Sequence, residues 1–225
     1  MQERRHPEVL RRKKIALAGV SILLALLVSA CGQPQVPAAN QVNQLILTDQ
    51  EMNQSLKEIA RHEREDMELY GSILSKGKSR NSNLEALLDQ ADGHISERRT
   101  LLEQAEAVMS RTKEQMEEVR TSLDELSFEK EENLAQAHTV LDQYEQRAAS
   151  FEAFVASYRE SLDADEQLYA LMRGNVEPNL VKIKRAIRER NSQYAKVAEL
   201  RQQFNKQTKA FNGANAKLVQ MEQAG

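Results

Sequence analysis

The clearest periodic pattern in this chain is the stretch LEALLDQADGHISERRTLLEQAEAVMSRTKEQMEEVRTSLDEL, residues 84–126. Within it, thirteen residues from Leu84 to Leu126 follow a strict alternation of steps of four and three, which places them on one face of an α-helix. Eleven of the thirteen are apolar, and the exceptions are Arg98 and Thr112. The spacing therefore predicts a long helix with one face buried along its whole length.

The stretch 134–172 resumes this spacing in a new phase, after a step of eight residues that leaves the alternation. The change of phase predicts a turn at about 124–131, with Ser127 as the N-cap of the next helix. That helix is expected to end before Gly174, a residue that suits a C-terminal cap. No glycine or proline stands in the predicted turn, so one helix over 84–173 is the alternative.

Two more helices flank these. The first is predicted from Thr48, where Thr48 and Glu51 form a capping box, to about Lys76. The last is predicted from Pro178, in its first turn, to about Met221. Short connections between long helices favour antiparallel neighbours. We therefore predict an all-α fold, an elongated antiparallel up-and-down bundle of four long helices, with three helices as the alternative.

The N-terminus has the layout of a bacterial lipoprotein signal peptide. A basic segment precedes the apolar run Ile15–Val28, and small residues then lead to Cys31, the one cysteine of the chain. The apolar run is shorter than the ~20 residues that cross a bilayer comfortably. We expect a signal peptide over 1–30 and lipid attachment at Cys31, with a free thiol at the end of an uncleaved anchor helix as the alternative.

Lipidation would locate the mature protein. A diacylglyceryl group supplies two acyl chains, and two chains give stable anchoring where one does not. The expected localisation is the extracellular face of the cytoplasmic membrane. Residues 31–47, where Pro34 and Pro37 disfavour helix, are expected to form a flexible tether, and residues 48–225 the helical bundle. The alternative is that some of Val42 to Leu47 join the first helix.

Charge is distributed unevenly along the mature chain. Residues 49–177 contain 15 basic and 29 acidic residues, whereas residues 178–225 contain 10 basic and 3 acidic residues. Five of these cations lie within nine residues, so the fourth helix begins with a basic cluster that would suit a polyanion. The alternative is that the cations pair with the acidic body. The expected compartment excludes nucleic acid as the partner. The cluster is Lys182, Lys184, Arg185, Arg188 and Arg190, of which the first four are the candidate polyanion contacts.

Recognisable catalytic chemistry is absent from the sequence. The segment Gly71–Ser79 has five residues between its glycines where a phosphate-binding loop needs four, and it follows a helix instead of a strand. The acidic run 63–66 is interpreted as a solvated helix face. No nucleophile–base pattern is visible, and the histidines lack metal-ligand spacing, so we expect no enzyme, no metal and no cofactor. These histidines are His6, His62, His94 and His138.

Two charged residues interrupt the apolar faces of the two central helices. With a turn near residue 130, antiparallel pairing places Arg98 roughly opposite Leu162, one helical turn from Asp165. A buried charge without a partner costs ~3–5 kcal/mol, so an Arg98–Asp165 ion pair is predicted. Glu63 on the first helix is a second candidate partner. The alternative is that both charges reach the surface at the edge of the face.

Several segments together resemble a known family. In the kind and order of these segments the chain resembles the YkyA-like cell-wall-binding lipoproteins of Gram-positive bacteria. The segments are Glu68-Leu69-Tyr70, ISERRTLLE (95–103), Tyr144-Glu145, YRESLDADEQLY (158–169), Asn191 to Tyr194 and FNKQTKAFN (204–212). The resemblance implies an all-helical, lipid-anchored, non-catalytic surface protein that contacts the wall. Peptidoglycan, teichoic acid and an envelope protein are the partners that fit it. The alternative function is a helical scaffold or regulator of an envelope enzyme that does not bind the wall directly.

Overall fold

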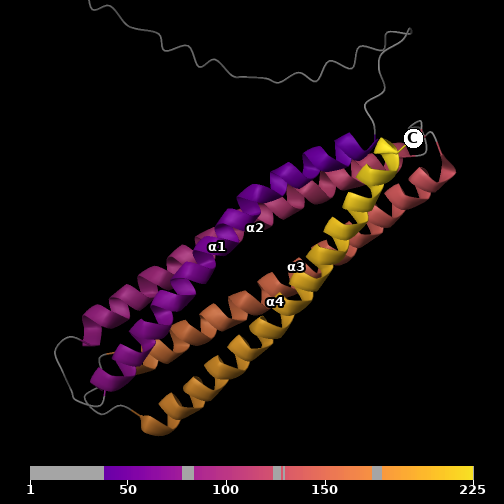
Figure 1. The fold of residues 1–225 in the computed structure, drawn as a ribbon. Helices are drawn as coiled ribbons and strands as arrows, with labels where there is room; N and C mark the ends of the chain where they lie inside the picture. The colour runs from indigo at the N-terminus through magenta and orange to yellow at the C-terminus, as the bar shows by residue number, and fades with distance from the viewer. Residues whose placement is uncertain (1–37, 78–83, 124–127, 129, 174–178, 225) are drawn as a thin grey trace, which may run out of the picture. The chain divides into compact units, whose positions relative to one another are not determined.

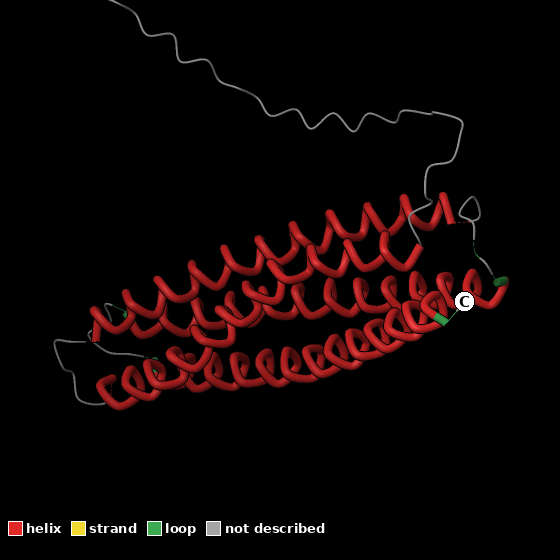
Figure 2. The backbone as a smooth tube through the Cα atoms, turned by 45° about the horizontal axis from the view of Figure 1, so that its top comes forward, coloured by secondary structure: helices red, strands yellow, loops and turns green. Residues whose placement is uncertain are grey.

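The computed structural model describes residues 38–77, 84–123, 128, 130–173 and 179–224. These residues form four α-helices and contain no strand: α1 (Ala38–Gly77), α2 (Leu84–Ser122), α3 (Glu131–Met172) and α4 (Leu180–Gln223). The helices run up and down, with α1 beside α2 and α3 beside α4 (Figure 1). A second view shows the four helices lying side by side along the length of the bundle (Figure 2). The predicted all-α four-helix bundle is confirmed, and the three-helix alternative is wrong.

The start of α1 differs from the prediction. The helix begins at Ala38, so the predicted start at Thr48 is wrong, and residues 38–47 are helical although they were assigned to the tether. Proline disfavours helix only around its own position, and the alanines and glutamines that follow Pro37 are good helix formers. Residues 31–37 lie outside the described part of the chain.

The turn between the central helices lies where the change of phase placed it. Helix α2 ends at Ser122 and α3 begins at Glu131, preceded by Lys130 in an extended conformation with φ −134° and ψ 142°. Ser127 lies outside the described residues, and Lys130, not Ser127, is the N-cap. Extended backbone at the N-cap interrupts the helical hydrogen bonding, so α2 and α3 are separate helices.

The side chain of Asn179 caps the N-terminus of helix α4. The side chain of Asn179 accepts a hydrogen bond of 3.0 Å from the backbone N–H of Lys182. The helix therefore begins at Leu180, and the prediction that its first turn contains Pro178 is wrong. Pro178 and Gly174 lie outside the described residues. Leu180 is 64% exposed, because it is the first helical residue, at the end of the bundle.

The core follows the predicted faces of α2 and α3. On α2 the alternating positions from Leu88 to Met116, Arg98 and Thr112 included, are buried. Where α3 meets α4, five aromatic residues gather in what we call the aromatic layer. Tyr144 and Phe211 have ring centroids 5.4 Å apart, and Phe151 and Phe204 have centroids 5.3 Å apart. The aromatic layer consists of Tyr144, Phe151, Phe154, Phe204 and Phe211.

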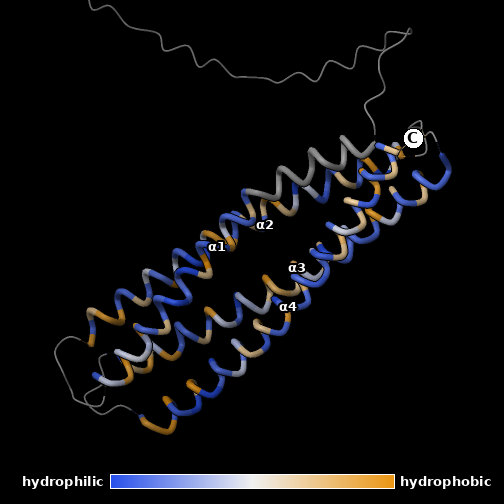
Figure 3. Tube along the Cα trace, viewed as in Figure 1, coloured by the Kyte–Doolittle hydropathy of each residue, from blue (hydrophilic) through white to orange (hydrophobic). Residues whose placement is uncertain are grey.

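Apolar residues are spread along each helix between hydrophilic ones (Figure 3). No helix of the described residues combines the length and the apolarity that a membrane span requires.

Candidate functional site

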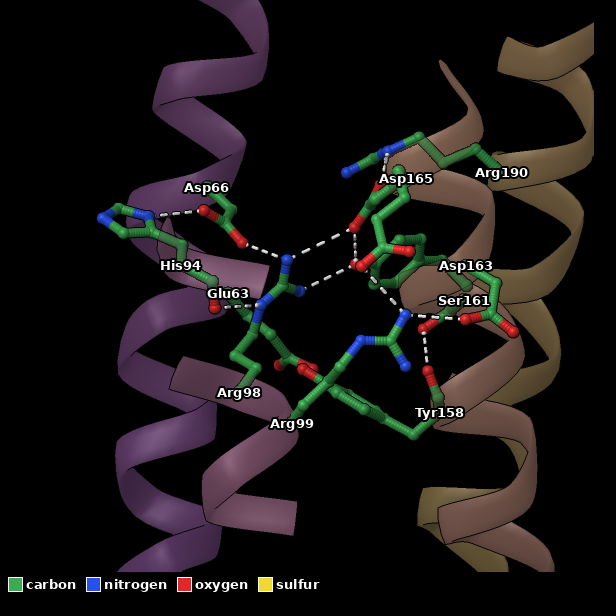
Figure 4. A network of polar contacts seen from close by, with 12 residues as sticks. Glu63, Asp66, His94, Arg98, Arg99, Tyr158, Ser161, Asp163, Asp165 and Arg190 are labelled. Carbon is green, nitrogen blue, oxygen red and sulfur yellow. Dashed lines mark hydrogen bonds and ion pairs between the residues drawn. The ribbon is translucent and has the colours of Figure 1, made fainter. Parts of the chain in front are cut away.

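All four helices contribute to a cluster of buried polar side chains, which we call the ionic layer (Figure 4). Helix α1 supplies a carboxylate, α2 a guanidinium and an imidazole, α3 a carboxylate, and α4 a guanidinium and a phenol. The side chains of Arg98 and Asp165 are each only 1% exposed. The layer consists of Asp66, His94, Arg98, Asp165, Arg190 and Tyr194.

The two central charges of the ionic layer meet as predicted. Nη2 of Arg98 lies 3.3 Å from Oδ2 of Asp165, which confirms the ion pair. Tyr194 bridges the same two residues, because its hydroxyl accepts a hydrogen bond of 2.8 Å from Nη1 of Arg98 and donates one of 2.5 Å to Asp165. Arg190 donates from Nε to the other oxygen of Asp165 at 2.5 Å.

The second carboxylate of the layer is Asp66, which contacts Arg98 and lies 2.6 Å from Nδ1 of His94. Asp66 is 4% exposed, so the interpretation of the run 63–66 as a solvated face is wrong at this position. Glu63 is not the partner of Arg98 either. It pairs with Arg201 of α4, whose Nη1 donates to Glu63 at 3.0 Å.

The surroundings shift the pKa values of Arg98 and Asp66 for different reasons. Burial lowers the pKa of Arg98, but Tyr194, Tyr158 and the two carboxylates outweigh burial and raise the pKa above its ordinary value. For Asp66, burial raises the pKa, and Arg98 and His94 oppose that rise. Two guanidinium groups balance two carboxylates, so the chemistry of the layer is ion pairing between helices.

The four candidate polyanion contacts lie in the first turns of α4. Lys182, Lys184, Arg185 and Arg188 are all exposed, and none forms an ion pair with any residue that the structure describes. Arg190 does not share their environment, because its side chain is 11% exposed and belongs to the ionic layer. At 100° per residue, Arg190 points in nearly the same direction as the buried Ile183, which separates it from the other four.

The same outward face continues along α4. Lys206, Lys209 and Lys217 are exposed and also lack an ion pair within the described part of the chain. With Lys184 and Arg188 they lie within about a quarter of the helix circumference at 100° per residue. We call this surface the cationic face of α4. It consists of Lys184, Arg185, Arg188, Lys206, Lys209 and Lys217, whereas the exposed Lys182 points about 160° away from Lys184.

The basic cluster predicted from the sequence supplies only the first part of the cationic face. The later lysines recur at helical spacing from Arg188 onward, and this spacing was the signal that could have found them. The cations of α4 that turn toward other helices are paired instead. Lys196 lies 2.9 Å from Glu160, and Arg201 contacts Glu63.

A group that could hold a metal ion lies where α1 meets α2. His62 and His94 have ring centroids 5.5 Å apart, and Glu65 lies beside them. Spacing along the sequence could not reveal this group, because its histidines belong to different helices. Cys31 lies outside the described residues.

Comparison with known proteins identifies the family. The family model YkyA, described as "Putative cell-wall binding lipoprotein", matches residues 34–221. No curated protein and no solved structure matches the chain. The match covers nearly all of the chain that follows the predicted signal peptide, and it includes all of α1, α2 and α3 and most of α4. The chain therefore belongs to the YkyA family.

Proposed function

We propose that this protein is a non-catalytic lipoprotein, held at the outer face of the cytoplasmic membrane by a diacylglyceryl group on Cys31. The cationic face of α4 contacts an anionic wall polymer, for which the phosphates of teichoic acid are the best fit. The observation that carries the proposal is that seven exposed cations of one helix have no acidic partner among the described residues.

The shape of the cationic face suits a linear polyanion. From Lys184 to Lys217 the helix rises about 50 Å at 1.5 Å per residue, so several phosphates of one chain could be contacted together. Helices α1, α2 and α3 together carry 25 acidic and 11 basic residues. Their net negative charge repels the same polymer, so the electrostatic field would turn α4 toward the wall.

A protein partner in the envelope is the second candidate. It is favoured by Leu180 and Val181, which are 64% and 79% exposed at the beginning of α4 beside Lys182. Two neighbouring apolar residues form a small surface, whereas the patches that mark protein interfaces usually cover several hundred Å². We therefore favour the wall polymer.

A charge-reversal variant tests the wall contact. Lys184→Glu, Arg185→Glu and Arg188→Glu together should release the protein from purified sacculi without unfolding it. Wild-type binding should weaken as salt rises, since exposed charges are screened over ~8–10 Å near physiological ionic strength. Sacculi stripped of teichoic acid should bind the wild type poorly.

The control for net charge is the triple variant Lys57→Glu, Arg64→Glu and Lys113→Glu, which changes three exposed cations of α1 and α2. It should bind sacculi as the wild type does. Equal loss in both triple variants, or salt-insensitive binding by the folded α4 variant, would exclude the cationic face as the wall contact.

The lipid anchor has a separate test. Cys31→Ala should abolish lipid labelling and leave the protein unprocessed or released from the membrane. Membrane-bound mature protein of unchanged size and unchanged lipid labelling in this variant would contradict the anchor.

A further inference from the structure

We propose that His62, Glu65, His94 and Glu97 form a site for a divalent transition metal of the zinc class, where α1 lies against α2. The site is independent of the cationic face of α4.

Each of the two helices supplies a histidine and, three residues later, a glutamate. Residues three apart share a side of a helix, so each histidine and its glutamate face the same way. Because α1 and α2 are antiparallel neighbours, the two pairs meet. Nδ1 of His62 lies 3.5 Å from Oε2 of Glu65 on its own helix and 3.3 Å from Oε2 of Glu97 on the other.

The surroundings of Nδ1 of His62 suit an atom that binds a metal ion better than an atom that forms a hydrogen bond. His62 is 7% exposed, and its buried Nδ1 has no hydrogen-bond partner despite the two nearby carboxylates. Buried polar atoms are normally hydrogen-bonded, so this orphan atom needs an explanation. Around a tetrahedral zinc ion with bonds of about 2.0–2.2 Å, ligand atoms lie roughly 3.4 Å apart. The separations of Nδ1 from the two carboxylate oxygens match that value.

His94 completes the donor set and is already oriented. Its Nδ1 lies 2.6 Å from Asp66, which leaves Nε2 for a metal, and Figure 4 shows the imidazole held by this contact. A carboxylate that holds a histidine in this way is the usual second partner of a metal-binding imidazole. Ligand atoms of His62, Glu65 and His94 all lie within 4.8 Å of one another.

Metal binding requires one local change. Nη2 of Arg61 lies 2.9 Å from Nε2 of His62, and Nε2 must carry the proton when Nδ1 binds a metal. Arg61 also donates from Nη1 to Oε1 of the proposed ligand Glu65 at 2.7 Å and pairs with Glu58. Its side chain is 44% exposed, so it can turn away and release both His62 and Glu65 without disturbing the core. Two imidazoles with carboxylates favour zinc, cobalt or nickel, and they discriminate against calcium and magnesium.

The test uses the full chain, freed of metal with a chelator. Zinc chloride is titrated by calorimetry, and cobalt chloride is used as a spectroscopic probe. We expect one Zn²⁺ per chain, a higher melting temperature with Zn²⁺, the visible absorption of tetrahedral Co²⁺, and no binding of Mg²⁺ or Ca²⁺. His62→Gln and His94→Gln should each weaken Zn²⁺ binding at least tenfold.

The matched controls are His138→Gln on α3 and Glu68→Gln on α1, which should bind Zn²⁺ as the wild type does. If a histidine variant fails to fold, Glu97→Gln decides, because Glu97 is 59% exposed and its loss should weaken Zn²⁺ binding without unfolding the bundle. The proposal is overturned by absence of Zn²⁺ binding, by unchanged affinity in His62→Gln and Glu97→Gln, or by an equal loss in His138→Gln.

Discussion

The ionic layer and the aromatic layer hold the same bundle by different means. The aromatic layer joins α3 to α4 through rings such as Phe151 and Phe204, whose centroids lie 5.3 Å apart. The ionic layer joins α1, α2 and α3 through directional contacts of Asp66, Arg98 and Asp165, and Arg190 and Tyr194 add α4. Apolar burial is non-directional and tolerates sliding, whereas an ion pair is satisfied at one register only. We infer that the aromatic layer supplies cohesion and the ionic layer supplies alignment between the two helical hairpins.

Each layer also contains a buried guanidinium, and the surroundings differ. Arg147, 2% exposed, lies 5.5–5.7 Å from the ring centroids of Tyr144, Phe204 and Phe211 and donates to Thr208 at 3.2 Å. Arg98 is instead surrounded by carboxylates. The electron-rich faces of the rings stabilise a cation without fixing its position as closely as a carboxylate does.

The largest effect is expected from removing the central carboxylate. Asp165→Ala leaves Arg98 and Arg190 buried without their shared partner, which should cost about 3–5 kcal/mol of unfolding free energy. Asp163→Ala, two residues away, removes an exposed pair with Arg99 and should cost less than about 1 kcal/mol. Urea unfolding of both variants measures the difference.

The same two variants test whether the ionic layer sets the alignment of the two helical hairpins. The distribution of distances between spin labels on α2 and α3 should broaden in Asp165→Ala and stay narrow in Asp163→Ala. Equal losses of stability, or an unchanged distance distribution, would show that the ionic layer does not set the register.

A smaller effect is expected in the aromatic layer. Phe204→Leu keeps an apolar side chain of comparable volume but loses the ring contacts with Phe151 and Phe154, and it should cost about 1–2 kcal/mol. Spin-label distances between α2 and α3 should not change. A register change here as large as in Asp165→Ala would remove the distinction between the two layers.

The smallest expected effect is a pH dependence at Asp66. Burial raises the pKa of this carboxyl in the folded state, so the associated stability is fully present below the unfolded pKa of about 3.9 and is lost as the pH rises through the folded value. The stability of the wild type relative to Asp66→Asn should therefore fall as the pH rises from about 4. Urea unfolding of both proteins across this range measures it. A constant difference, or one of opposite sign, would mean that Arg98 and His94 outweigh burial.

Local patterns predicted the helices well and their ends less well. The alternation of steps along 84–126 and 134–172 located α2 and α3 because burial of one helical face requires that spacing. The start of α1 was missed because a favourable capping box at Thr48 competes with residues 38–47, six of which are alanine, glutamine or leucine and are good helix formers. A cap does not end a helix when the residues before it can continue the helix.

Residue types and their spacing suffice to predict the helical class, the interruption of two apolar faces by Arg98 and Asp165, and the excess of cations in α4. Packing between the helices sets which of those cations point inward, and it brings Asp66 to Arg98, Glu63 to Arg201, and His62 to His94. The physical reason is that spacing determines a direction around one helix axis. A contact between two helices depends also on the rotation and the register of both, which the packing of the whole core sets.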